Sequence, residues 1–113
     1  MNKYKILYMA PITSEEQHQT MGPEDGQKMM QQWMAWYNKQ GAAIIDPGVP
    51  LSSGMDYTTT TSAKLQAPYI VGYSVVEAAD MNAAHKMISD HPHLTMPGAS
   101  IQVLEMLPAP TSM

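Results

Sequence analysis

The sequence predicts a small α+β domain in which two helices cover one face of a four-stranded antiparallel sheet. Residues 3–10 and 69–76 are apolar runs without breakers, typical of buried strands. Each is followed by a helical pattern and then by another strand-like run, at 42–45 and 100–107. Two such halves are typical of the ferredoxin-like split βαβ fold. Without a linker or an internal repeat, residues 1–113 are predicted to form one domain.

The predicted strands 3–10 and 69–76 are apolar on both of their faces. In the first strand, one face carries Tyr4, Ile6 and Tyr8. The opposite face carries Leu7 and Met9. A strand of this kind is typical of the middle of a sheet that is covered on both sides. Because the helices cover only one face, we expect the other face to pack against a second copy of the chain in a homodimer.

The first helix is predicted to run from Pro23 to the residue before Gly41. Proline suits the first helical position, and glycine suits the position just after a helix. Its apolar residues form one wide face that includes Trp33 and Trp36. Such a face either belongs to the core or forms the wall of a pocket, and in both cases we expect Trp33 to be buried.

The second helix is predicted to begin after Asp80, which suits the N-cap position, and to end before Pro92. The residue before a proline is disfavoured in a helix, so His91, Pro92 and His93 form a corner that leads into the last strand. Gly72, inside the central strand 69–76, predicts that another group approaches the backbone closely there.

Two connecting segments are polar and rich in turn formers. Residues 11–22 are predicted to form a loop with at most one helical turn, on which His18 is exposed. Residues 48–66 include four consecutive threonines, which favour strands, and are predicted to form either a hairpin or a mobile loop.

Composition excludes several classes of function. The net charge is −4, all six basic residues are lysines and none cluster, so we expect no nucleic-acid partner. No apolar segment approaches the roughly 18 residues of a membrane span, so we expect no membrane partner and a cytoplasmic location. The chain has no cysteine for disulfides or thiolate chemistry, and no cofactor motif is present. Its 12 methionines suit an adaptable core or an adaptable ligand pocket.

Short motifs distributed over nearly the whole chain resemble those of a known family. They are LYMAP (7–11), WMAWY (33–37), IIDPGVPL (44–51), GYSVVEA (72–78), HPHL (91–94) and PGASIQVLEMLP (97–108). In order and spacing these motifs resemble the YCII-related proteins of the dimeric α+β barrel superfamily. The Asp-Gly-Pro-Phe signature of one branch is absent, because the chain has no Phe.

The resemblance implies a homodimer whose sheets pack face to face, with a cleft in each protomer near the ends of the central strands. Most members of the family have no known activity, and some carry a His–Asp pair proposed to be catalytic. The wider superfamily includes cofactor-free monooxygenases, lactone isomerases and haem-handling enzymes.

The best candidate for chemistry is Asp46 together with His91. A carboxylate that holds a histidine fixes its tautomer and stabilises its protonated form, as proton transfer requires. We expect His91 at the mouth of a cleft, near its ordinary pKa of about 6.5, with Asp46 within reach. The alternative is that Asp46 stabilises its own Pro-Gly turn and that His91 caps the end of its helix.

Three further residues are candidate ligand-binding groups, namely Trp33, Tyr73 and His93. His91 and His93 have the spacing of two metal ligands on an extended chain, but zinc needs three or four, so no metal site is predicted. The sequence thus favours a small-molecule-binding protein or enzyme. A non-catalytic homo-oligomeric interaction subunit is the alternative, and a haem-related or monooxygenase-like activity is a second one that rests on superfamily analogy.

Overall fold

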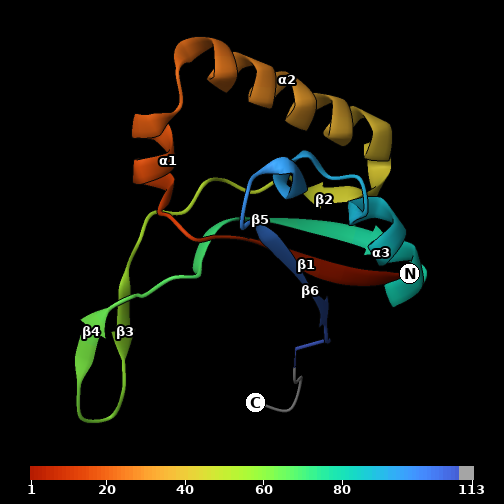
Figure 1. Cartoon of the computed structure of the whole chain (residues 1–113). Helices are drawn as coiled ribbons and strands as arrows, with labels where there is room; N and C mark the ends of the chain where they lie inside the picture. The colour runs from red at the N-terminus through yellow and green to blue at the C-terminus, as the bar shows by residue number, and fades with distance from the viewer. Residues whose placement is uncertain (110–113) are drawn as a thin grey trace.

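The computed structural model describes residues 1–109, so the last four residues of the predicted domain lie outside the described part. The fold is α+β (Figure 1). The strands are β1 (Asn2–Ala10), β2 (Ile44–Asp46), β3 (Met55–Tyr57), β4 (Ser62–Lys64), β5 (Tyr69–Ala78) and β6 (Ser100–Met106). The helices are α1 (Ser14–Thr20), α2 (Pro23–Gln40) and α3 (Met81–Ile88), with short 3-10 helices η1 (Gly41–Ala43) and η2 (Pro92–Thr95).

Four strands form the main sheet, in the order β2-β5-β1-β6, and every neighbouring pair is antiparallel. The two long strands β1 and β5 lie in the middle, with Tyr4 opposite Val76 and Ile6 opposite Ser74. The predicted four-stranded antiparallel sheet is therefore confirmed. Its strand order is compatible with a ferredoxin-like fold.

Three helices are present rather than two. α1 replaces most of the predicted loop, because Thr13 and Glu16 form a reciprocal capping box that satisfies the first backbone N–H groups of the helix. α2 has the predicted ends, with Pro23 in its first turn and Gly41 at φ 57°, a backbone conformation that favours glycine. Asp80 caps α3 by accepting a hydrogen bond of 2.8 Å from the Ala83 N–H.

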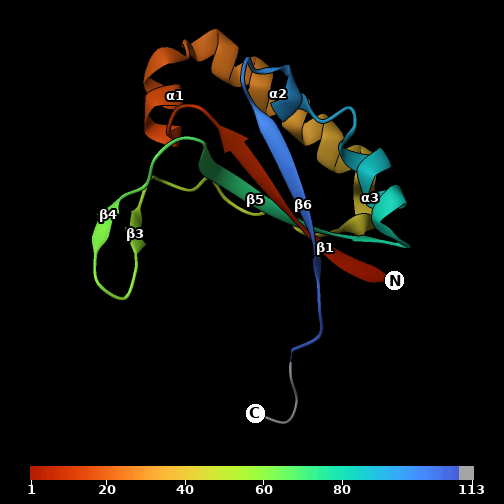
Figure 2. The ribbon, with the colours of Figure 1, turned by 60° about the horizontal axis from the view of Figure 1, so that its bottom comes forward.

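The core lies between the sheet and the two longer helices, which share one side of the sheet (Figures 1 and 2). Tyr4, Ile6 and Tyr8 project from β1 toward this side and are fully buried. From the helices only Trp36, Ala84 and Ile88 join the buried cluster. The apolar face predicted for the first helix is thus fully buried at one residue, Trp36, while Trp33 and Tyr37 are partly buried against the core.

The opposite face of the sheet carries no helix (Figure 2). Register places Lys5 beside Val75 on β5 and beside Leu104 on β6, so this face mixes apolar side chains with lysines. Lys5 Nζ lies 4.9 Å from the centre of the Tyr73 ring, and Leu104 is 50% exposed. The predicted apolar character of this face holds only in part.

Residues 48–66 adopt the predicted hairpin rather than the loop. β3 and β4 pair beside the main sheet, and the hairpin projects away from the body of the molecule (Figure 1). The threonines 58–61 form its turn, not a strand, because Thr58 Oγ1 accepts a hydrogen bond of 2.9 Å from the Thr61 N–H. None of the described helices is long and apolar enough to cross a membrane.

Candidate functional site

A cavity of about 510 Å³ lies beneath α2, between this helix and the sheet, and is lined by α2 residues from Gly26 to Tyr37. Its wall comes from α1, α2, the loop 47–50, β5 and the end of η2. This volume falls within the range of about 300–1,000 Å³ that is typical of small-molecule sites. The lining is mainly apolar and includes four methionines, Met21, Met29, Met30 and Met96.

Two glycines open the floor of the cavity. Gly72 has no side chain to fill the space, and a Cβ added there would lie 3.4 Å from the Tyr8 ring and 3.6 Å from the Val49 carbonyl oxygen. The loop 47–50 therefore crosses close above β5, as the glycine in this strand predicted. Gly48, at φ 76°, permits the same approach, because any Cβ there would collide with the Tyr73 carbonyl oxygen.

Two hydroxyl groups donate to the Pro47 carbonyl at one end of the cavity, and a third donates to one of these two hydroxyls. Ser74 Oγ donates to this carbonyl at 2.8 Å and Tyr37 donates to it at 3.0 Å. A serine hydroxyl has a single proton, so in the 2.8 Å contact between Tyr8 and Ser74 the tyrosine must be the donor. All three protons are thus used within the protein. Burial raises the pKa of both Tyr8 and Tyr37, so both stay neutral.

His91 lies in an aromatic box outside the cavity lining. Its ring centre is 4.4 Å from that of Trp36, 4.5 Å from that of Trp33 and 4.8 Å from that of Tyr8. Nδ1 accepts a hydrogen bond of 3.0 Å from the His93 N–H, which places the proton of the neutral ring on Nε2. Nε2 is buried and has no hydrogen-bond partner among the described residues.

Burial controls the charge of this histidine. His91 is 1% exposed, and removal from water lowers its pKa to about 3, with His93 acting in the same direction and Asp90 against it. The expectation that His91 sits at a cleft mouth with an ordinary pKa is therefore wrong. Pro92 ends the helix as predicted, but the two tryptophans of α2 then close over the preceding residue.

Asp46 ends β2 and stabilises the turn that follows it. Its carboxylate accepts a hydrogen bond of 2.9 Å from the Gly48 N–H, as the alternative turn interpretation predicts. Within residues 1–109 no hydrogen bond joins Asp46 to His91. The catalytic role of this pair stays a prediction, without a shared contact to support it.

The three predicted ligand-binding residues, Trp33, Tyr73 and His93, all line the cavity. Trp33 is half-buried and packs edge-on against Tyr8, at 4.7 Å between ring centres. His93 is buried, its Nε2 donates to the Met9 carbonyl at 2.8 Å, and burial lowers its pKa. Tyr73 contributes less to the cavity wall, because its ring contacts Lys5 on the helix-free face of the sheet.

Sequence reasoning missed several wall residues. His18 lines the cavity from α1 and is exposed there, although it was expected on a loop. The Thr13-x-x-Glu16 capping signature was a readable signal for this helix. With α1 recognised, Gln17 and Met21 also become candidates, since they lie close to His18 on one short helix and its C-cap.

The described part of the chain holds no group of three or more His, Asp or Glu side chains placed to bind a metal ion. Comparison with known proteins adds no further assignment. No protein-family model matches the sequence, and no curated protein matches it either.

Proposed function

We propose that this protein binds a small, mainly apolar molecule in the cavity between α2 and the sheet. The cavity itself carries the proposal, because its volume of about 510 Å³ and its mainly apolar lining are those of small-molecule sites. The wall is formed by one chain, and it combines aromatic rings with flexible thioethers that can adapt to a ligand.

The hydrogen bonds of the wall favour an apolar ligand. Tyr8, Tyr37 and Ser74 donate their protons within the protein, and the His93 Nε2 proton is donated to a backbone carbonyl. These groups therefore hold the wall in shape and offer no free donor to a carboxylate or phosphate. The exposed edge of Trp33 offers an aromatic surface instead.

Binding is better supported than acid–base catalysis through His91. For His91 to exchange a proton with a substrate, the box formed by Tyr8, Trp33 and Trp36 would have to open. A haem-related or monooxygenase-like activity rests on superfamily analogy, which is a weak warrant for function. We therefore favour a carrier or sensor of an apolar molecule over an enzyme that uses the His–Asp pair.

Native mass spectrometry of gently purified protein tests the proposal, together with titration of octanol followed by tryptophan fluorescence, to which Trp33 and Trp36 both contribute. Gly72→Val places a branched side chain at the cavity floor and should abolish both the bound mass and the octanol response. Ile70→Val, on the same strand but outside the lining, should change neither. If the wild-type chain carries no ligand and octanol leaves the fluorescence unchanged, the proposal is wrong.

A second proposal concerns assembly, and the helix-free face of the sheet motivates it. Leu104 and Met106 remain 50% and 43% exposed on this face, beside Lys3 and Lys5 of β1 and Glu77 of β5. Two copies related by a two-fold axis would bury the leucines and let lysines of one copy face the glutamate of the other. Such pairing would give the dimeric α+β barrel that the YCII-related resemblance implies.

Sedimentation at micromolar concentration tests this assembly. The wild-type chain should sediment as a dimer, and Leu104→Glu should shift it toward the monomer because a carboxylate would be buried in the interface. Leu94→Glu provides the matched control, since Leu94 is also exposed but belongs to η2 on the other side of the sheet. A monomeric wild-type chain would leave the interaction-subunit alternative without support as well.

A further inference from the structure

A second hollow adjoins the cavity. It has a volume of about 600 Å³ and is more open to solvent, and its wall includes residues of the 11–12 segment, α1, the first half of α2 and the segment 95–97. Four residues line both spaces: Gln17, Met21, Met29 and Met96. These four side chains therefore form a partition between an inner chamber, which is the cavity described above, and an outer chamber at the surface.

The partition consists entirely of unbranched, flexible side chains. Methionine has three rotatable side-chain bonds and readily changes rotamer, so a wall of three methionines and a glutamine can reshape at little cost. The polar contact across it is a hydrogen bond from Gln17 Nε2 to the Met96 sulfur at 2.9 Å, and a thioether is a weak acceptor. No backbone segment needs to move for the two chambers to join.

The backbone around the partition is itself weakly held. No residue in the first half of α2 is buried, and Met30 is 64% exposed. Gly26 lies in this half, and the Cβ that it lacks would lie 3.9 Å from the Met21 sulfur. The helix therefore leaves room for the Met21 side chain to swing on the side of the partition.

We propose that the partition is a gate, and that the two chambers form one elongated site for a molecule with a long aliphatic chain and a single polar end. This inference rests on the proposed binding function and specifies the shape of its ligand. The aliphatic chain of the ligand occupies the inner chamber, where the protein offers rings and thioethers and where the three buried hydroxyls and the His93 ring donate their protons within the protein. It passes between the methionines, and the polar end remains in the outer chamber.

The outer chamber suits a polar end. Its lining includes Thr20, Asp25, Lys28 and Gln32, which offer a hydroxyl, a carboxylate, an ammonium and an amide. The only ion pair in the described part of the chain joins Lys39 to Asp90, so Lys28 and Asp25 are not paired with each other. Both can therefore hydrogen-bond a ligand hydroxyl without first giving up a salt bridge.

Calorimetric titration with hexanol, octanol, decanol and dodecanol tests the gate. Each methylene that stays buried should raise the affinity about fourfold, the equivalent of about 0.8 kcal/mol. Affinity should keep rising to dodecanol in the wild-type chain, because the longer chains extend through the partition. Met29→Trp should block the passage and lower the dodecanol affinity at least about tenfold more than it lowers the hexanol affinity.

The matched control is Met34→Trp, one turn further along the same helix, at a half-exposed position that lines neither chamber. It should bind every alcohol as the wild-type chain does. If affinity stops rising at octanol and Met29→Trp has no selective effect, the gate is refuted while the binding function stands. If no alcohol of any length binds the wild-type chain, the binding function itself is refuted.

Discussion

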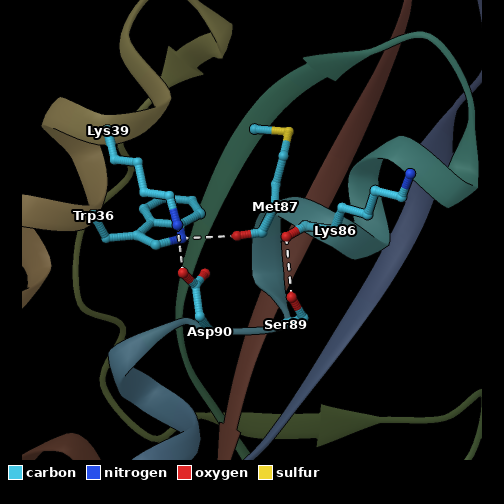
Figure 3. Close-up of polar contacts among 6 residues, drawn as sticks. All are labelled: Trp36, Lys39, Lys86, Met87, Ser89 and Asp90. Atoms are coloured by element: carbon cyan, nitrogen blue, oxygen red, sulfur yellow. Dashed lines mark hydrogen bonds and ion pairs between the residues drawn. The ribbon is translucent and has the colours of Figure 1, made fainter.

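The two halves of α2 are held in very different ways. The second half is anchored to α3: the Trp36 indole N–H donates to the Met87 carbonyl at 2.9 Å, and Lys39 forms an ion pair with Asp90 (Figure 3). The first half contributes no buried residue and stands over the cavity instead. One helix thus combines an anchored end with a part that faces the cavity and contributes no buried residue.

Truncation of the two tryptophans should show most strongly how the anchored end of α2 differs from the part that faces the cavity. Trp36 is 4% exposed in the aromatic box, so Trp36→Ala should lower the free energy of unfolding by about 3–5 kcal/mol, as large aromatic truncations in cores do. Trp33 is only half-buried and already faces an open space, so Trp33→Ala should cost clearly less. Urea denaturation of both variants measures the difference.

Met34→Ala serves as the reference for helix propensity in this comparison, because its side chain is half-exposed and outside the core. Equal losses for the two tryptophan variants would show that the part of α2 that faces the cavity is packed as tightly as its anchored end. The contrast between these two parts would then be wrong.

Acid should unfold the anchored half first. The pKa of His91 is about 3 in the folded chain and about 6.5 when unfolded, so between these values only the unfolded state binds the proton. The contribution of the neutral His91 ring to the free energy of unfolding is therefore at its full value above pH 6.5, and it is lost as the pH falls toward 3. The loss should approach about 1.4 kcal/mol per pH unit for one group. Burial lowers the pKa of His93 as well, so its contribution has the same sign.

Urea denaturation at a series of pH values from 7 to 4 measures this slope. His91→Phe keeps an aromatic ring in the box but removes the titrating group, so its slope should be smaller and should retain the part due to His93. His85→Phe, an exposed position on α3, should keep the full slope. A wild-type stability that does not change between pH 7 and 4 would contradict the burial of a neutral His91.

The ends of α2 and the inner face of β1 were the more predictable features of the fold. Pro23 and Gly41 mark the helix ends through local backbone preferences, which a sequence displays directly. The alternation of Tyr4, Ile6 and Tyr8 likewise identified the inner face of the central strand. These features depend on the chain within a few residues of each position.

The cavity depends on distances between segments, which no local pattern contains. The stripe that includes Met30 and Trp33 looks the same whether the helix lies on the sheet or stands away from it. Burial of His91 depends on two tryptophans about 55 residues earlier in the chain. Candidate residues of the cavity wall could therefore be named from the sequence. That His91 and Asp46 share no contact with each other could not be predicted from it.

The smallest expected effect concerns Gly26, in the unanchored half of α2. Glycine inside a helix is unfavourable by up to about 1 kcal/mol relative to alanine, because it loses more backbone freedom on folding. An added Cβ would meet only the Met21 sulfur, at an ordinary contact distance of 3.9 Å, so Gly26→Ala should stabilise the chain by about 0.5–1 kcal/mol.

Hydrogen exchange should slow at the amides of this half, while those near Trp36 should keep their rates. Gly22→Ala, outside the helix interior and with nothing within 4 Å of the added Cβ, should give no such gain. If Gly26→Ala also weakens dodecanol binding, flexibility of this half is needed to pass the gate, whereas a destabilised variant would mean that the first half of α2 is packed as tightly as the second.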